Sequence, residues 1–133
     1  VIEKKEGDVL HIANGSYRII LPGSQTERAY AIIEMKVPPG AGPGPHSHEN
    51  IEEVFYVASG QVDFRSGAGV ITAKAGDTVR IPKGGAIHAF KNNSTSDATL
   101  ICTVYPAGLE DMFAEVASVD RSQARAVGMS TPS

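Results

Sequence analysis

Short apolar segments separated by turn residues recur along most of the chain, and this pattern is typical of an all-β sandwich or barrel. The segment AYAIIEMKV (29–37) alternates most clearly. Ile33 and Met35 belong to its apolar face, whereas Glu34 and Lys36 lie on the opposite face, because side chains in a strand alternate. We expect the apolar face to point into the protein.

Eight further segments have the same character. They are DVLHI (8–12), SYRIIL (16–21), EVFYVASG (53–60), the two arms of a hairpin around 62–64 and 70–71, TVRIP (78–82), AIHAFKN (86–92) and ATLICTVY (98–105). Residues 66–69 supply the glycines that the turn of the hairpin needs. We therefore predict an all-β barrel core over about residues 8–105.

The spacing of the apolar residues changes after Pro106. Leu109, Met112, Phe113 and Val116 recur at helical spacing, with acidic residues on the far side. The spacing predicts one short amphipathic helix over about residues 107–118 that packs on the barrel or, as an alternative, mediates dimerisation. The tail, 119–133, has no periodicity, and no linker divides the chain, so we expect a single domain over 1–133.

Charge and cysteine usage exclude several classes of partner. The net charge is −3, and the basic residues are scattered instead of forming a stripe that could neutralise phosphates, so we expect no nucleic-acid partner. No apolar run approaches the roughly 20 residues that cross a bilayer, so we expect no membrane partner. Cys102 is the single cysteine, which excludes an internal disulfide and leads us to expect a cytoplasmic protein in which Cys102 is a small buried hydrophobe.

Two of the four histidines, His46 and His48, stand one residue apart after a coil rich in proline and glycine. In an extended chain they project from the same face, about 6.6 Å apart at the base, and can close on one divalent transition metal ion. Glu52 and Glu53 are the nearby carboxylates, and a turn at 49–51 must bring either one back. A third imidazole would come from one of the two remaining histidines.

The histidines and glutamate occur within two longer motifs. The pattern G-x5-H-x-H-x4-E-x6-G is matched by Gly40, His46, His48, Glu53 and Gly60. The pattern G-x5-P-x-G-x2-H-x3-N is matched by Gly76, Pro82, Gly84, His88 and Asn92, except that three residues instead of two separate Gly84 from His88. The chain resembles the cupins in these motifs, and over most of its length it resembles the small single-domain cupins of the quercetin-dioxygenase-like type.

This resemblance implies a small jelly-roll β-barrel with the C-terminal helix on it, and a homodimer. It also implies that His46, His48, Glu53 and His88 are metal ligands. The motif selects Glu53, which precedes Gly60 by six residues, over its neighbour. His11 has no partner at ligand spacing, and we interpret it as an ordinary strand residue.

Three neutral imidazoles and one carboxylate around a divalent ion leave a net charge of +1 and, at six-coordination, two open positions. This favours a bidentate or anionic oxygen ligand, such as an enolate or phenolate. With Fe, Mn, Ni or Cu such a site suits oxidative cleavage by dioxygen, whereas with Zn it suits cyclisation or isomerisation. Glu53 is then a candidate general base. The expected substrate-binding walls are apolar, from Ile33, Met35, Phe55, Val57 and Phe90.

We therefore predict a metal-dependent enzyme for a small molecule, in first place a quercetinase-like dioxygenase that acts on an aromatic or enolisable oxygenated substrate. A metal-dependent cyclase or isomerase is the second hypothesis. The third is a non-catalytic ligand-binding or sensory cupin. The complete set of ligand residues favours an enzyme, because a purely structural barrel has little need for four converging polar groups inside an apolar interior.

Overall fold

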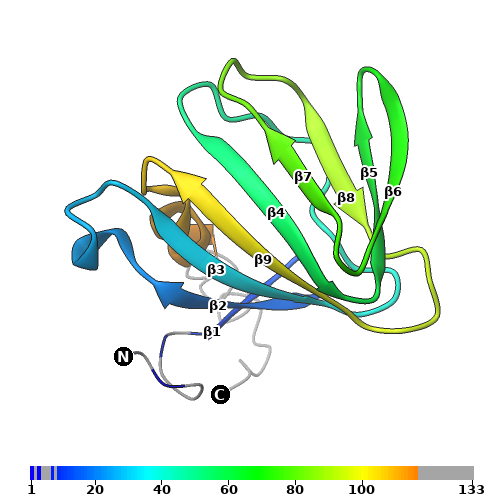
Figure 1. The fold of residues 1–133 in the computed structure, drawn as a ribbon, viewed down its shortest axis with the longest axis horizontal. Helices are drawn as coiled ribbons and strands as arrows, with labels where there is room; N and C mark the ends of the chain where they lie inside the picture. Colours follow the sequence, from blue (N-terminus) through cyan, green and yellow to red (C-terminus); the bar gives the residue numbers. More distant parts are fainter. Residues whose placement is uncertain (2, 4–6, 8, 117–133) are drawn as a thin grey trace, which may run out of the picture.

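Two antiparallel β-sheets make up the protein (Figure 1). The computed structural model describes residues 1, 3, 7 and 9–116. The larger sheet has six strands in the order β1-β2-β3-β9-β4-β7, and the smaller has three in the order β6-β5-β8. The elements are β1 Val9–Ile12, β2 Gly15–Leu21, the 3-10 turn η1 Gly23–Gln25, β3 Ala31–Val37, β4 Glu52–Ser59, β5 Gln61–Ser66, β6 Gly69–Lys74, β7 Thr78–Ile81, β8 His88–Lys91 and β9 Ala98–Tyr105.

The strands fall where the sequence predicts them, so the all-β jelly-roll class is confirmed. The hairpin β5–β6 turns through residues 67 and 68, because Ser66 pairs with Gly69. Residues 109–116 are helical, as their apolar spacing predicts. Residues 107 and 108, the predicted start of the helix, precede it and are not helical, whereas 117–118 and the whole predicted tail lie outside the described residues.

The hydrophobic core lies between the two sheets and includes side chains from both. Strand β3 buries every second residue toward it, as alternation predicts. Three phenylalanines join the sheets: the ring centroid of Phe55 on β4 lies 5.2 Å from that of Phe64 on β5 and 5.6 Å from that of Phe90 on β8. Aromatic pairs of this kind contribute about 0.5–1.5 kcal/mol beyond their buried area. They fix the spacing between the sheets next to the histidines.

Asn92, directly after β8, holds the connection between β8 and β9 and is 0% exposed. Its Nδ2 donates hydrogen bonds to the carbonyls of Val37 (2.8 Å) and Ser96 (2.7 Å). Its Oδ1 accepts from the backbone N–H of Ser94 (2.9 Å) and from the hydroxyl of that residue (2.6 Å). Every polar atom of the amide is therefore satisfied, so the motif asparagine has a structural role.

Glu110 ties the helix to the turn η1 and is only 4% exposed. Its two carboxylate oxygens accept backbone N–H groups from Gly23 (2.8 Å) and Gly108 (2.7 Å). On the surface nearby, Arg28 donates to the carboxylate of Asp111 at 3.0 Å. These bonds anchor the first turn of the helix against the larger sheet, at the side where β2 and β3 lie (Figure 1). Across the described residues, no helix has the length and apolar character needed to cross a membrane.

Candidate metal centre

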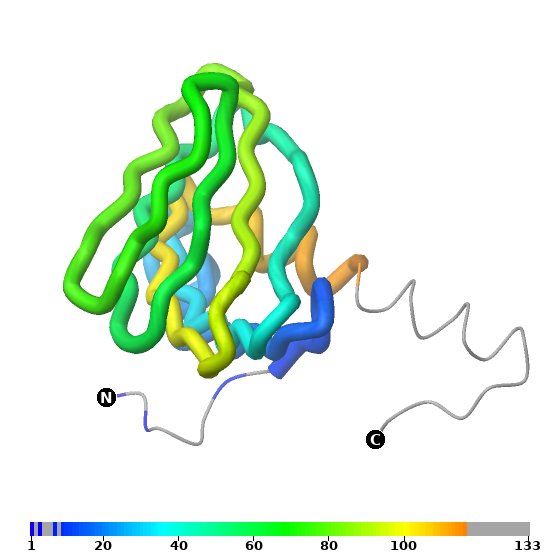
Figure 2. The backbone as a smooth tube through the Cα atoms, turned by 90° about the vertical axis from the view of Figure 1, so that its right-hand side faces the viewer, coloured from blue at the N-terminus to red at the C-terminus, as the bar shows by residue number. Residues whose placement is uncertain are grey.

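The long connection from β3 to β4, residues 38–51, runs beside β8 (Figure 2). The backbone N–H of His46 donates to the carbonyl of His88 at 3.0 Å, and the N–H of His88 donates to the carbonyl of His46 at 2.9 Å. This isolated antiparallel bridge does not extend into a ladder. Pro45, which lacks an N–H group, stands next to it. Two histidines distant in sequence are thereby fixed to each other through their main chains.

Two turns deliver the remaining residues. The chain bends at Glu49 and Asn50 and enters β4, so that Glu53 faces inward; Asn50 does not use the left-handed conformation that it would tolerate. The N–H of Gly84 donates to the carbonyl of Glu49 at 2.9 Å. Gly84 and Gly85 both have positive φ, 126° and 76°, which glycine adopts without steric cost. The turn with the additional residue therefore still brings His88 to the interior.

Three of the four predicted ligand residues, His46, His48 and Glu53, form a compact group, and His88 adjoins it through its contact with Glu53. Glu53 Oε1 lies 3.6 Å from His48 Nε2 and 3.3 Å from His88 Nε2. Potential ligand atoms of His46, His48 and Glu53 all lie within 4.8 Å of one another. The ring centroid of His46 is 4.3 Å from that of His88. The side chains of Glu53 and His88 are each 2% exposed, so the cluster has a buried and a more open side.

Backbone carbonyls orient two of the rings. His46 Nδ1 lies 2.8 Å from the carbonyl oxygen of Gly44, and His88 Nδ1 lies 2.9 Å from that of Ala86. Since a carbonyl only accepts, both Nδ1 atoms carry the proton and donate it. Each neutral ring therefore presents an unprotonated Nε2, the form that binds a metal.

Two buried polar atoms in the cluster, Glu53 Oε1 and His88 Nε2, have no hydrogen-bond partner among the described residues. With Glu53 ionised and His88 neutral, two acceptors face each other at 3.3 Å, which is unfavourable unless a shared proton or a cation lies between them. Imidazole nitrogens with one carboxylate are a usual donor set for divalent transition metals. The residues present fit such an ion.

The buried His88 and the partly buried His48 differ in their proton affinity. Contact with the Glu53 carboxylate raises the pKa of His88 above its ordinary value of 6.5, although burial opposes this. Burial lowers the pKa of His48, although the same carboxylate opposes it. Of these two histidines, His88 therefore binds a proton more readily.

A cavity of about 210 Å³ opens at the cluster. His46, His48 and Glu53 line part of it, and the remaining wall is largely apolar, made by Tyr17, Met35, Pro43, Gly44, Phe55, Phe90, Leu109, Met112, Phe113 and Val116. Of the predicted substrate-binding residues, Met35, Phe55 and Phe90 therefore face the cavity. Ile33 and Val57 do not line it and are both 0% exposed, packed in the core.

Tyr17 and the helix also line the cavity, although they were not predicted as site residues. Tyr17 lies in β2 between Ser16 and Arg18, two polar residues of the opposite face. This alternation in the sequence could have indicated that Tyr17 faces inward. Burial raises the pKa of Tyr17 well above its ordinary value of 10.0, so the phenol stays protonated. Its ring meets that of Phe113 edge-on, 5.3 Å between centroids, which places the helix over the cavity.

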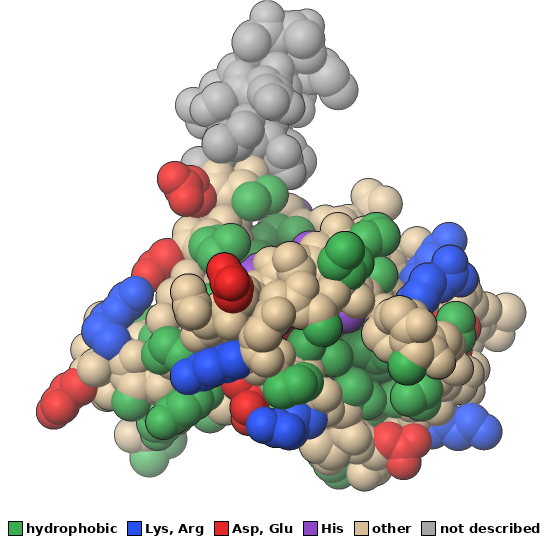
Figure 3. Space-filling view, turned by 90° about the horizontal axis from the view of Figure 1, so that it is seen from above, with side chains coloured by type: hydrophobic (Ala, Val, Ile, Leu, Met, Phe, Trp, Pro, Cys, Tyr) green, Lys and Arg blue, Asp and Glu red, His purple; other side chains and the backbone are tan. Residues whose placement is uncertain are grey.

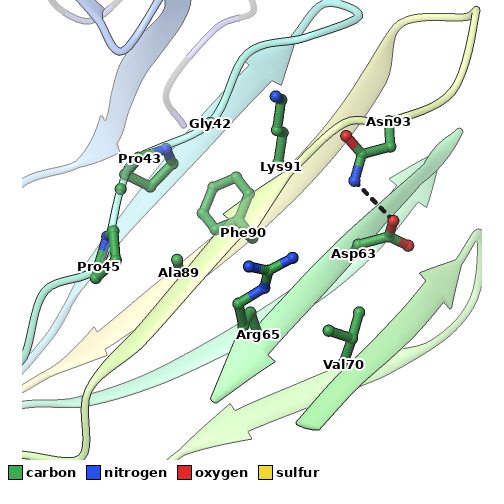
Figure 4. Close-up of a pocket in the computed structure, with 11 residues that line it drawn as sticks. Gly42, Pro43, Pro45, Asp63, Arg65, Val70, Ala89, Phe90, Lys91 and Asn93 are labelled. Carbon is green, nitrogen blue, oxygen red and sulfur yellow. Dashed lines mark hydrogen bonds between the residues drawn. The ribbon is translucent and has the colours of Figure 1, made fainter. Parts of the chain in front are cut away.

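Seen from above, small areas of histidine are visible between hydrophobic side chains (Figure 3). Another hollow, of about 360 Å³, lies where Pro43 and Pro45 face the outward side chains of Asp63 and Arg65 on β5 (Figure 4). No residue of the histidine and glutamate cluster lines it. Asp63 there accepts a hydrogen bond from Asn93 Nδ2 at 2.8 Å, and we assign the chemistry to the smaller cavity, which the cluster lines.

Three other residues lie as expected from the sequence. Cys102 is buried, and its thiol faces Glu53 Oε2 at 4.0 Å; burial raises the pKa of this thiol, which stays neutral. Glu52 points outward and accepts a hydrogen bond from Arg80 at 2.8 Å, so Glu53 is the carboxylate inside the barrel. His11 is exposed on β1.

Two facing antiparallel sheets with a compact histidine and glutamate cluster between them define the class of jelly-roll proteins with a site inside the barrel. The cupin domain model matches residues 33–104, more than half of the chain. The chain belongs to the cupin family.

Individual relatives show the same fold. An oxalate-binding protein of Thermotoga maritima is 30% identical over 77 residues, which make up 58% of this chain and 63% of that protein. This chain thus matches less than two thirds of that relative. A predicted oxalate decarboxylase from Thermotoga maritima has a similar structure (TM-score 0.69, 23% identity, 80% of this chain and 98% of that chain). The polyketide cyclase RemF from Streptomyces resistomycificus is also similar (TM-score 0.70, 16% identity, 79% and 78%).

Proposed function

We propose that His46, His48, Glu53 and His88 bind one divalent transition metal ion, and that the protein is a metal-dependent enzyme for a small oxygenated molecule. The observation that carries this proposal is the pair of buried, unpartnered atoms Glu53 Oε1 and His88 Nε2, 3.3 Å apart. A barrel that only needed to be stable would gain from apolar side chains at these positions. The presence of two polar side chains here is explained if both of them bind a cation.

Charge balance indicates the kind of substrate. A divalent ion with three neutral imidazoles and one carboxylate has a net charge of +1, and among the described residues no Lys or Arg lines the cavity. A substrate that binds as a monoanion through two oxygens would make the buried centre neutral. A dianion would leave an uncompensated negative charge among apolar side chains, which is costly. Enols, phenols and hydroxyketones fit this requirement.

The size and walls of the cavity limit the substrate further. Its volume of about 210 Å³ is below the ~300–1,000 Å³ of pockets for drug-sized ligands. Phe55, Phe90 and the helix side chains favour an apolar or aromatic body. A single-ring or short-chain substrate suits the cavity better than a large flavonoid.

When bound, the metal supplies Lewis acidity and, if it is redox-active, the reaction of the bound substrate with dioxygen. The protein's own residues have simpler tasks. The carbonyls of Gly44 and Ala86 hold the rings of His46 and His88 in the ligating tautomer. Glu53 is the carboxylate in the cavity wall and can take the proton that an enol loses. The apolar wall excludes water. Our first proposal remains oxidative cleavage by dioxygen, the reaction type of the quercetinases, on a single-ring or short-chain substrate.

Two alternatives have specific support. The likeness to a polyketide cyclase favours a reaction without dioxygen, such as cyclisation or isomerisation. The likeness to an oxalate-binding protein favours simple binding of a dicarboxylate, but the apolar wall and the charge balance speak against a small dianion. A homodimer and a cytoplasmic location remain predictions.

The decisive experiment starts with elemental analysis of protein purified without chelators. Protein reconstituted with Fe, Mn, Ni, Cu or Zn is then assayed in an oxygen electrode with single-ring enol and phenol substrates. Oxygen uptake that is lost in His88→Ala supports the dioxygenase. Metal-dependent turnover without oxygen uptake supports the cyclase or isomerase. Absence of metal binding by the wild-type protein would contradict the proposal as a whole.

A further inference from the structure

The hydroxyl of Tyr17 belongs to a buried side chain and has no evident structural purpose. The residue is 1% exposed and lines the same cavity as His46, His48 and Glu53. Within the described ranges, no residue forms a hydrogen bond with this hydroxyl, although buried tyrosine hydroxyls usually find a partner. Phenylalanine would fill the same space without leaving a polar group unpaired.

The surroundings of Tyr17 fix the ring and leave the hydroxyl available. The edge-on contact with Phe113, 5.3 Å between centroids, holds one side of the ring. Pairing of Tyr17 with Met35 across β2 and β3 fixes the backbone. The rest of the wall comes mainly from hydrocarbon and thioether side chains, so among the residues that the structure describes, Tyr17 is the one hydrogen-bonding side chain of the lining besides the candidate ligands.

Burial raises the pKa of the Tyr17 phenol above its ordinary value of 10.0, so at neutral pH the hydroxyl keeps its proton and can donate a hydrogen bond. Tyr17 lines the same cavity as Glu53, and Cys102 lies beside that carboxylate. Both of those groups have other tasks: Glu53 Oε1 faces two histidines, and Cys102 Sγ faces Glu53 Oε2. A substrate oxygen is the acceptor that remains.

We propose that Tyr17 is a substrate-binding residue, whose hydroxyl donates a hydrogen bond to an oxygen atom of the substrate next to the metal ligands. The inference rests on the proposed function and makes it more specific. The substrate must carry an acceptor oxygen that the phenol reaches while its apolar body contacts Phe113 and Phe55. A donor at this place also favours the anionic form of an enol or phenol over the neutral form.

The experiment uses tropolone, a single-ring monoanionic chelator, as the probe. Its dissociation constant is measured by calorimetry for metal-loaded wild type, Tyr17→Phe and the control Tyr56→Phe, whose parent residue is 47% exposed and outside the cavity. Loss of one hydrogen bond to an anionic oxygen weakens binding by roughly tenfold or more. We expect this loss for Tyr17→Phe and wild-type affinity for Tyr56→Phe.

Two further measurements separate the possible failures. Metal affinity should be the same in Tyr17→Phe and wild type, because Tyr17 is not a ligand. The thermal midpoint of the metal-free variant should equal or exceed that of wild type, since an unpaired hydroxyl is removed. Unchanged tropolone affinity in a stable, metal-loaded Tyr17→Phe, or a lowered midpoint, would overturn the assignment of Tyr17 alone. If wild type binds no metal, the proposed function fails instead.

Discussion

At the residue scale, the candidate centre depends on the atoms that four side chains present to one another. His88 is the most informative of them, because it comes from the second motif, is 2% exposed and faces Glu53 at 3.3 Å. The turn before it contains one more residue than the motif pattern, and two glycines with positive φ absorb the difference.

We expect His88→Ala to abolish stable metal binding. Changes in residues that only orient a ligand cost about 10–100-fold in metal affinity, so loss of a ligand should cost roughly 100-fold or more. Metal affinity is measured by competition with a chromogenic chelator. The matched control is His11→Ala, which removes an exposed histidine and should retain wild-type affinity. Equal affinity of the two variants would exclude His88 as a ligand.

Metal affinity should also depend on pH in a defined direction. The Glu53 carboxylate raises the pKa of His88 above 6.5, so a proton occupies this site at higher pH than in an ordinary histidine. That proton must leave before Nε2 can bind a cation. Apparent affinity should therefore begin to fall at a pH above 6.5 as the solution is acidified. His48 does not compete there, because burial lowers its pKa. A decline confined to pH values below 6.5 would argue against this coupling.

At the element scale, local patterns predicted the strands well and the connections less well. Buried and less buried residues alternate along β3 and β9. This alternation depends only on neighbouring residues, so it can be recognised in the sequence. The segment that carries His46 and His48 forms a single bridge instead of a strand pair. The spacing of Leu109, Met112 and Phe113 predicted a helix that packs on the barrel. It could not reveal that this helix covers a cavity, because that depends on contacts with residues far away in the chain, such as Tyr17.

The connection between β8 and β9 should be sensitive to Asn92. Asn92→Ala removes four hydrogen bonds of the buried amide and leaves the carbonyls of Val37 and Ser96 without this donor. We expect the free energy of unfolding to fall by about 2–4 kcal/mol, measured by urea titration. Asn93→Ala, which removes an exposed amide, should change it by no more than about 0.5 kcal/mol. Similar losses in both variants would contradict the role of Asn92.

The attachment of the helix should depend on Glu110 in the same way. Glu110→Ala leaves the N–H groups of Gly23 and Gly108 unpaired in a buried place, and each bond to a charged group contributes about 1.5–3 kcal/mol. We expect a loss of roughly 2–4 kcal/mol by urea titration. Glu115→Ala, on the exposed side of the same helix, is the control and should have little effect. A stable Glu110→Ala protein would mean that apolar contacts alone hold the helix.

At the scale of the whole molecule, the candidate ligands join the connection before β4, the strand β4 and the strand β8, and thus both sheets. A cation that binds the folded but not the unfolded chain stabilises the fold by about 2.7 kcal/mol at 100 times its dissociation constant. For a chain of this size that corresponds to a rise in thermal midpoint of about 10 °C. Calorimetric scans with and without metal measure it. No rise is expected in His88→Ala, and a rise of equal size there would indicate binding elsewhere.

The paired amides of His46 and His88 have one more consequence. The backbone N–H of each residue donates to the carbonyl of the other, at 3.0 and 2.9 Å, so the two residues move together when the barrel fluctuates. Opening the sheets cannot separate these two rings without first breaking that double link. Release of a bound ion should thus be slow and should coincide with large-scale opening of the barrel. The rate at which these two amide protons exchange with deuterium measures that opening.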